Sequence, residues 1–220
     1  MLKKTIVIIV AVVVIAALTP VNSESQWKTL LNKKGIVVYG KKVKDSKFWE
    51  VVAITTIKTS LFSLIRMWED VGSYPEWFHS CAEGRLVKKV GRLERYIYLV
   101  TDSPSPLQDR DNILHVLFKQ NKESRVVEIL LKGIPDYLPE KKKFVRVPRT
   151  YGKVTLKPQA DGNIKVIFNL FLDPGGLVPF WLVNSFSEDF YFKTLKNMRE
   201  KVIQEKYQKH DYPFLLNYPE

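Results

Sequence analysis

The segment 164–172 alternates strictly between two kinds of side chain. Its even-numbered positions are all apolar, whereas its odd-numbered positions include a lysine and an asparagine. The apolar positions are Ile164, Val166, Phe168, Leu170 and Leu172. Successive side chains of a β-strand point to opposite faces, so this pattern predicts a strand of a sheet with one wholly apolar face. Another part of the chain must cover that face.

The C-terminal part of the chain contains a suitable cover. Residues 173–176 (DPGG) turn the chain, Pro179 suits a first helical turn, and residues 180–206 contain neither Gly nor Pro, which predicts a long helix. Residues 180–183 are apolar all round, and the later part narrows to a stripe. The stripe consists of Tyr191, Leu195, Met198 and Val202. A helix that is apolar on all sides at one end is buried on both sides there or abuts a cavity.

The remainder of the chain is mainly strand-like. Runs rich in β-branched and aromatic residues, separated by short turns, predict an antiparallel meander. These runs are residues 36–39, 48–57, 85–89, 92–101, 112–120, 125–132 and 144–156. Two longer connections, 102–111 and 133–143, each contain two prolines and are expected to be loops.

Three short segments have helical features. Residues 26–32 (QWKTLLN) predict a short helix closed by Gly35. Ser60 can cap a helix with apolar residues at 61, 64, 65 and 68, ending near Gly72. Residues 74–78, with two aromatics after Pro75, form either a tight helical turn or an irregular corner.

The N-terminus has the pattern of a secretory signal peptide. Lys3 and Lys4 precede an unbroken apolar run at 6–18, and small or modest residues follow at 21 and 23. The run is shorter than the roughly 20 residues of a membrane span, so an uncleaved anchor is the alternative. We expect a signal peptide at 1–23, a folded domain at 24–212 and a tail at 213–220. The expected compartment is the periplasm.

Charge and cysteine content limit the partners. The chain has 35 Lys+Arg against 23 Asp+Glu, a net charge of +12. Export disfavours nucleic acid, and the excess charge favours contact with anionic membrane surfaces. The single cysteine, Cys81, cannot form an internal disulfide and is expected to be a small buried hydrophobe in a monomeric protein.

No complete catalytic set is visible. His79, Cys81 and Glu83 could face one way on an extended segment, but nothing supplies an oxyanion hole. The three histidines lack metal-ligand spacing, and no phosphate-binding glycine loop occurs. We therefore expect no catalytic residue, no cofactor and no metal.

Six short motifs occur in order along the chain: residues 35–39 (GIVVY), 74–77 (YPEW), 109–111 (DRD), 139–146 (PEKKKFVR), 152–158 (GKVTLKP) and 173–184 (DPGGLVPFWLVN). Together and in this order they resemble the START family, the steroidogenic-acute-regulatory-related lipid-transfer domains. The resemblance implies an α+β helix-grip fold, in which a curved antiparallel sheet wraps around a long C-terminal helix and encloses a lipid-sized tunnel.

The resemblance also suggests which residues contact a ligand. The apolar candidates for the tunnel lining are Trp77, Phe168, Leu170, Trp181, Phe186 and Phe190. Arg110 is expected within the fold or near the tunnel mouth. Sterol carriers of the family use a buried acid–arginine pair on adjacent strands, which residues 92–98 and 113–116 do not contain. His115, Tyr96 and Tyr98 are the alternative polar contacts.

The predicted function is a non-enzymatic carrier of a lipid or a sterol-like apolar molecule. A tunnel enzyme and an interaction domain with a filled core are the two alternatives. The gate is expected among the two proline loops and the helix start at Pro179. Lys141, Lys142 and Lys143 could hold the second loop near anionic head groups, and Trp181 could lie at a membrane interface.

Overall fold

The computed structural model describes residues 27–208; the predicted signal peptide and C-terminal tail lie outside the described residues. The strands are β1 (Lys28–Lys33), β2 (Ile36–Lys42), β3 (Trp49–Ile57), β4 (Cys81–Val90), β5 (Glu94–Thr101), β6 (Arg110–Gln120), β7 (Val127–Gly133), β8 (Val145–Arg146), β9 (Arg149–Pro158) and β10 (Ile164–Asp173). The α-helices are α1 (Leu61–Glu69), α2 (Tyr74–Trp77), α3 (Phe180–Lys201) and α4 (Glu205–Gln208), and two 3-10 turns span Val71–Ser73 and Pro135–Tyr137.

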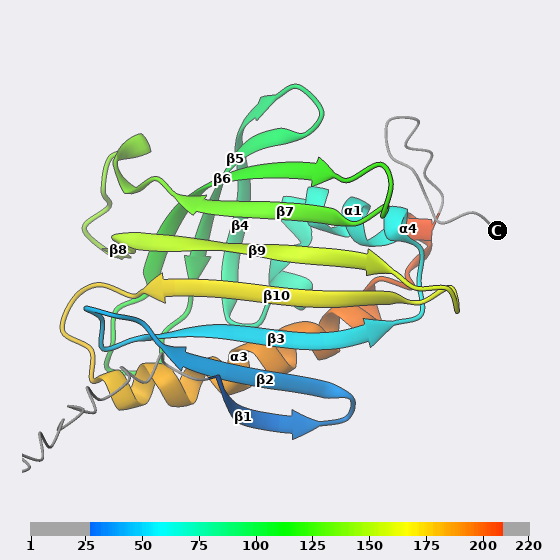
Figure 1. The fold of residues 1–220 in the computed structure, drawn as a ribbon. Coiled ribbons are helices and arrows are strands. Elements are labelled where there is room, and N and C mark those ends of the chain that lie inside the picture. The colour runs from blue at the N-terminus through cyan, green and yellow to red at the C-terminus, as the bar shows by residue number, and fades with distance from the viewer. Residues whose placement is uncertain (1–26, 209–220) are drawn as a thin grey trace, which may run out of the picture.

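The strands form one curved sheet of ten strands in the order β1-β2-β3-β10-β9-β7-β6-β5-β4 (Figure 1). All neighbours on this path are antiparallel, and the short β8 pairs with β6 in parallel. The long helix α3 packs behind β2 and β3 and also contacts α2. This arrangement confirms the predicted α+β helix-grip fold. Between residues 27 and 208, no helix combines the length and apolar character needed to cross a membrane.

The central strand β10 has the alternation expected from its sequence. Ile164, Val166, Phe168 and Leu170 are buried between the sheet and the helices. On the opposite face, the Asn169 amide donates a hydrogen bond to Glu50 Oε1 at 2.8 Å. Pairing with β3 on one side and β9 on the other places this apolar row in the middle of the sheet.

Helix α1 begins at the predicted cap. Ser60 Oγ accepts a hydrogen bond from the Ser63 backbone N–H at 3.0 Å, and the apolar positions of the helix are buried. This bond satisfies one of the free N–H groups at the helix start.

The prediction of a helix at 26–32 was wrong, because this segment is strand β1. Lys34 and Gly35 both have positive φ, at 52° and 67°, and form the two-residue turn of a hairpin that joins β1 to β2. Such turns match the twist of the two strands they connect. Gly35 was interpreted as a helix end, but the same conformational freedom serves a hairpin.

Two other predicted boundaries were also wrong. The predicted strand 144–156 is divided into β8 and β9, because Pro148 has no N–H to donate to a ladder. The predicted helix 180–206 ends at Lys201, and a turn separates it from α4. Tyr207 of α4 is buried, and its hydroxyl lies 2.9 Å from Ser73 Oγ and 3.1 Å from Asp70 Oδ2.

A buried ion pair fixes the β8 end of the sheet. Arg146 Nε donates to Asp111 Oδ1 at 2.8 Å, and its Nη2 donates to Asp111 Oδ2 at 3.0 Å. The remaining guanidinium N–H groups donate to the backbone oxygens of Pro135, Leu138 and Pro139. Hydrogen bonds from Arg146 to Asp111 raise the pKa of the guanidinium, so it stays charged. One side chain thereby holds β8 on β6 and anchors the loop between β7 and β8.

We predict that breaking this pair costs far more than breaking an exposed one. Asp111→Asn or Arg146→Met should each lower the free energy of unfolding by about 3–5 kcal/mol, because each leaves a buried group without its partner. The double variant should lose less than the sum of the two, since it leaves no unpaired charge. Urea unfolding measures these differences.

The exposed pair Lys153–Glu128 is the control. Its side chains are 47% and 37% exposed, so Glu128→Gln should cost less than about 1 kcal/mol. If the two single substitutions at Asp111 and Arg146 lowered the free energy of unfolding additively in the double variant, the two side chains would not be coupled.

Candidate functional site

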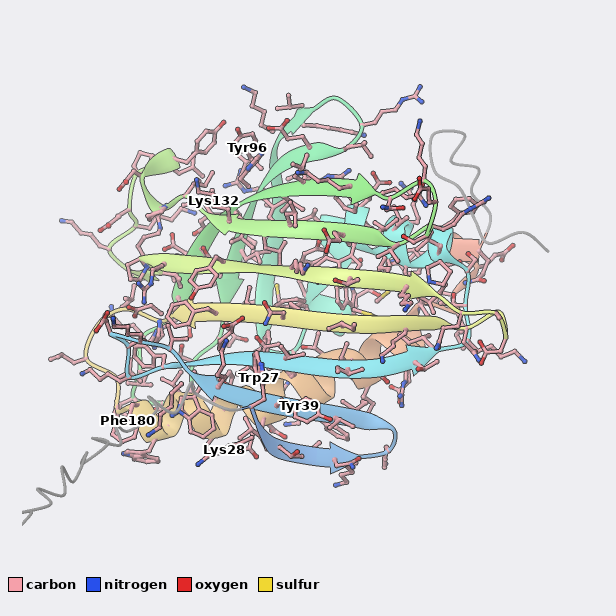
Figure 2. The ribbon with its side chains drawn as sticks, viewed as in Figure 1. Trp27, Lys28, Tyr39, Tyr96, Lys132 and Phe180 are labelled. Atoms are coloured by element: carbon pink, nitrogen blue, oxygen red, sulfur yellow. The ribbon has the colours of Figure 1, made fainter. Side chains whose placement is uncertain are left out.

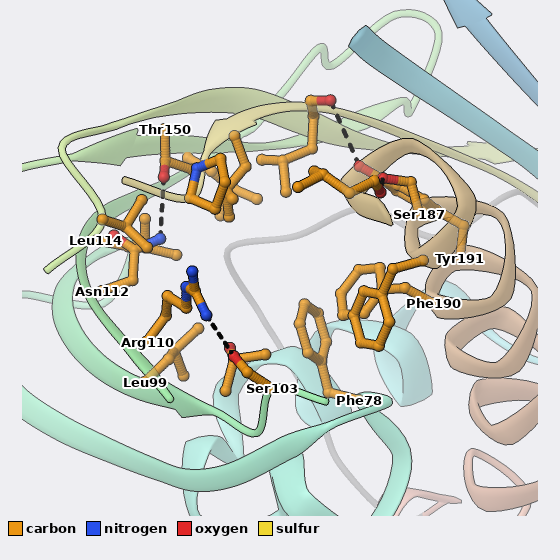
Figure 3. A pocket seen from close by; sticks show the side chains of 18 of the residues that line it. Phe78, Leu99, Ser103, Arg110, Asn112, Leu114, Thr150, Ser187, Phe190 and Tyr191 are labelled. Carbon is orange, nitrogen blue, oxygen red and sulfur yellow. Dashed lines mark hydrogen bonds between the residues drawn. The ribbon is translucent and has the colours of Figure 1, made fainter. Parts of the chain in front are cut away.

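A cavity of about 160 Å³ lies between the concave face of the sheet, helix α3 and the loop at 102–109 (Figure 3). Strands β5, β6, β7, β9 and β10 contribute side chains from the sheet. The loop contributes Ser103, Pro104 and Leu107, while α3 contributes one face. The residues of α3 are Leu182, Val183, Phe186, Ser187, Phe190 and Tyr191. The cavity therefore lies where the apolar start of the helix meets the sheet.

Strand alternation determines which residues of β5 and β6 reach the cavity. In β5 these are the odd-numbered positions, and in β6 the even-numbered ones. The cavity-facing residues pair across the two strands as Ile97 with Leu114, Leu99 with Asn112, and Thr101 with Arg110. Because neighbouring side chains point to opposite faces, Asp111 points away from the cavity although Arg110 points into it.

One end of the cavity is aromatic. Phe78 lies 5.2 Å from Phe190 and 6.1 Å from Phe168, measured between ring centroids. Trp68 meets Phe168 edge-on at 5.8 Å. Edge-to-face and tilted contacts of this kind hold the rings in place and leave an apolar wall.

The other end of the cavity is polar. Arg110 Nη1 donates to Ser103 Oγ at 3.0 Å and to the Gln108 carbonyl oxygen at 2.5 Å. The Asn112 amide donates to Thr150 Oγ1 at 3.0 Å, and Figure 3 shows these groups across the cavity from Phe78 and Phe190. Burial lowers the pKa of Arg110, and only the nearby Asp109 charge opposes that shift. The site thus combines apolar walls with one cationic group.

The structure brings five of the predicted site residues together around the cavity. They are Arg110, Phe168, Leu170, Phe186 and Phe190. Their contact with a ligand remains a prediction. They come from strands β6 and β10 and from helix α3, and the curvature of the sheet brings these elements together.

Tyr96, Tyr98 and His115 were wrongly placed in the tunnel lining. All three occupy the positions of β5 and β6 that point to the outer face, so they cannot line the cavity. Tyr96 (Figure 2) stacks on Tyr137 at 4.7 Å between ring centroids. His115 Nε2 lies 2.8 Å from Glu94 Oε1, and the Tyr98 hydroxyl donates to Asp111 Oδ2 at 3.1 Å.

Trp77 and Trp181 also lie away from the cavity lining. Trp77 is buried in α2 against Trp68, at 5.2 Å between ring centroids, and belongs to the core. Trp181 is 63% exposed at the start of α3. The helical period turns Leu182, Val183 and Phe186 inward and leaves Trp181 on the outer side.

The predicted gate residues lie at one end of the sheet. Lys141, Lys142 and Lys143 are exposed, and Lys141 Nζ lies 4.5 Å from the centroid of the Tyr98 ring on the outer face. None of the three lines the cavity. Pro179 directly precedes α3 and provides no side-chain hydrogen bond to cap it. The loop at 102–109 and the start of α3 are therefore the segments that border the cavity.

Sequence reasoning missed Ser103, Asn112 and Thr150 in the cavity and Arg146 behind it. Arg110 and Asn112 are two residues apart, so a strand starting at Arg110 places both on one face. That spacing could have identified Asn112. Thr150 and Arg146 reach their partners only through the pairing of distant strands, which no local pattern shows.

His79 and Cys81 do not form a nucleophile–base pair in the structure. The Cys81 thiol donates to the Glu83 carbonyl oxygen, and burial raises its pKa to about 12. The His79 ring stacks on Phe186 at 6.3 Å, and burial lowers its pKa. Among residues 27–208, no group of three or more His, Cys, Asp or Glu is arranged to hold a metal ion.

Comparison with known proteins identifies the class of protein. The START domain family matches residues 16–208, and the chain therefore belongs to the START domain family. An uncharacterized protein of Pseudomonas aeruginosa is 35% identical over 173 residues, which cover 79% of this chain and 85% of that protein. Bovine phosphatidylcholine transfer protein is 24% identical over 186 residues, with 81% and 85% covered.

Solved structures show the same fold. A STAR-related lipid transfer protein of Xanthomonas axonopodis has 30% sequence identity and a TM-score of 0.75, covering 81% of this chain and 99% of the crystallised fragment. Human STARD10 has 17% identity and a TM-score of 0.70, covering 81% of this chain and 74% of that structure.

We predict that Cys81 is unreactive in the folded protein. A thiol pKa near 12 leaves far less thiolate at pH 8 than the usual value of 9.0, and burial limits access. Iodoacetamide should therefore label native Cys81 more slowly, on the order of a hundredfold or more, than Cys81 of the urea-unfolded chain. Fast labelling of the native protein would indicate an activated cysteine and favour an enzyme.

Proposed function

We propose that the protein binds a lipid or another apolar small molecule in its internal cavity and carries it without changing it chemically. The observation that supports this most directly is the cavity enclosed by the sheet and α3, with aromatic walls and few polar groups. Burial of apolar surface provides about 25 cal/mol per Å² removed from water, and a few polar groups set orientation. The bovine relative is named for phosphatidylcholine transfer, which is consistent with a lipid ligand.

Uptake of a ligand with a long chain requires part of the wall to move. A cavity of about 160 Å³ suits a molecule the size of a small ring. The loop at 133–143 is a poor candidate for the moving part, because Arg146 holds three of its carbonyl oxygens. We place the gate at the loop 102–109 and the first turns of α3. The N-cap of α3, Pro179, makes no side-chain bond that would hold this helix start in place.

The start of α3 is also the proposed contact with a membrane. Leu177, Phe180 and Trp181 are all exposed there, and Figure 2 shows Phe180 at this end of the helix. The turn before α3 lies against β8, since Gly175 approaches Val145 closely, and the lysine triplet 141–143 belongs to the same end of the sheet. Exposed apolar side chains and lysines at the same end of the molecule suit an anionic bilayer surface.

Carriage in the periplasm is part of the proposal. Lys3 and Lys4 before the apolar run at 6–18 support export, and they also support the alternative of an uncleaved anchor. Catalysis has weaker support. The ionisable groups that line the cavity are Arg110, Tyr74 and Tyr191. Burial raises the pKa of both tyrosines far above neutrality, so neither serves as a base.

We predict that filling the cavity abolishes ligand binding without unfolding the protein. Leu114→Trp places a large ring where a lining leucine stands, whereas Leu86→Trp adds the same ring at a site that is 47% exposed. Native mass spectrometry and organic extraction should recover an apolar ligand from the wild type and Leu86→Trp, but not from Leu114→Trp.

Thermal unfolding should show that Leu114→Trp remains folded, because the ring occupies existing space. Failure to recover any ligand from the wild type after expression and after incubation with lipid vesicles would favour an interaction domain with a filled core.

We predict that the exposed end of α3 governs exchange with membranes. Trp181→Ala should slow lipid exchange with anionic vesicles and leave the melting temperature nearly unchanged, because the side chain is 63% exposed.

Replacing Lys141, Lys142 and Lys143 by Gln should slow exchange most at low salt, where charges are least screened. Fluorescent lipid transfer measures both effects.

The control variant removes three lysine charges from another part of the surface. Lys88, Lys89 and Lys122 are exposed, and their replacement by Gln should affect exchange less. Equal effects of the two triple variants would show that net charge alone matters, and no effect of Trp181→Ala would exclude this end of α3 as the docking site.

A further inference from the structure

Arg110 is a buried cation, and the surrounding residues accept hydrogen bonds from only part of its guanidinium. It is 9% exposed and lines the cavity. Its Nη1 is bonded to Ser103 and Gln108, but its Nε is buried without a hydrogen-bond partner. No acidic side chain within residues 27–208 forms an ion pair with it. Asp109 is nearby, but its Oδ1 accepts the Ser103 backbone N–H at 2.9 Å.

Arg146, on the neighbouring strand β8, is a buried arginine whose N–H groups all have hydrogen-bond partners. Its guanidinium binds both oxygens of Asp111 and three carbonyl oxygens. A guanidinium stays charged in proteins, and a buried charge without a counter-ion is costly. Neutral side chains could make the two bonds of Arg110 that hold the loop, so loop closure alone does not explain a cation at this position. A negatively charged group of a bound ligand would explain why this position has a cation.

The polar groups around Arg110 also suit an anion. Thr150 Oγ1 accepts from the Asn112 amide and keeps its own hydroxyl proton for another acceptor. Figure 3 shows Arg110, Asn112 and Thr150 on one side of the cavity, with Phe78 and Phe190 on the other. A molecule that fills this space must be polar at one end and apolar at the other.

We infer that the ligand is an amphiphile with an oxyanion head, a carboxylate or a phosphate, which binds Arg110 while its apolar chain lies against Phe78, Phe168 and Phe190. This inference rests on the proposed function, because it names the class of lipid that the cavity selects. The head pairs with the guanidinium through charge-assisted hydrogen bonds, including one from the free Nε.

The test compares lipids with the same oleoyl or oleyl chain, one with a charged head group and one with a neutral head group. Displacement of the uncharged dye Nile red at pH 8, below the concentration at which the lipids aggregate, measures the affinities of oleate and oleyl alcohol. A second pair, 1-oleoyl-lysophosphatidate and monoolein, asks the same question of a phosphate head. The variants are Arg110→Gln, which removes the charge, and Arg110→Lys, which keeps it.

Arg85→Gln is the control, because Arg85 is 49% exposed on β4 and does not line the cavity. We expect the wild type and Arg85→Gln to prefer at least one anionic lipid over its neutral partner. Arg110→Gln should reduce that preference about 10- to 100-fold, the size of a charge-assisted hydrogen bond. Arg110→Lys should retain more of it. Any loosening of the 102–109 loop changes both lipids of a pair alike, so the ratio isolates the charge.

The two lipid pairs identify the source of the oxyanion. Loss of preference for oleate alone assigns a carboxylate, and loss for lysophosphatidate alone assigns a phosphate. Equal affinity for charged and neutral lipids in the folded wild type, or an unchanged ratio in Arg110→Gln, would refute the inference and leave lipid binding intact. If neither Nile red nor any of the four lipids binds, the proposed function itself is refuted. Should Arg110→Gln fail to fold, the wild-type ratio and Arg110→Lys still decide the question.

Discussion

The ion pair between Asp111 and Arg146 organises the end of the molecule where the cavity lies. Asp111 is the second residue of the long strand β6, and Arg146 lies opposite it in the two-residue strand β8. The guanidinium donates five hydrogen bonds, two to the carboxylate and three to backbone oxygens of one loop. Because every N–H group has a partner, the desolvation of the charge is offset and the geometry is fixed. The loop between β7 and β8 is thereby held on the outer side of the sheet.

With that loop held outside, the cavity is enclosed by two other segments. The loop 102–109 covers the beginning of β6, and the start of α3 covers the apolar face of β10. Both are held less firmly than the β7–β8 loop. Arg110 provides two bonds to the first, while α3 begins without a side-chain cap and with Phe180 and Trp181 in solvent. These two segments are therefore the ones that we propose to open.

Arg110 and Asp111, which are adjacent in β6, have different roles. Asp111 joins a closed network behind the sheet, while Arg110, one residue earlier, faces the cavity with its Nε–H buried and unpaired. Strand geometry separates the two side chains across the thickness of the sheet. A structural arginine–acid pair and a cation available to a ligand therefore lie close together without neutralising each other.

Much of the fold follows from local patterns, and part of it does not. The alternation in β10, the cap of α1 and the run before α3 predict these elements because each has one apolar and one polar side, or a distinct end signal. Strand β1 was not predicted because a glycine such as Gly35 suits both the end of a helix and the turn of a hairpin. Only the pairing of β1 with β2 distinguishes the two.

The sequence by itself determined most of the strands after β1 and the apolar face of β10 that needs a helix to cover it. Tertiary structure alone decided which side of β5 and β6 faces the cavity. Residues 110–114 are all buried, because a second apolar cluster around Tyr98, Val100 and Ile113 packs on the outer face. With both faces covered, polarity no longer alternates along the strand, and Tyr96 and His115 could not be distinguished from true lining residues by pattern. Strand register and the loop anchored by Arg146 make that distinction, and both depend on contacts between residues far apart in the chain.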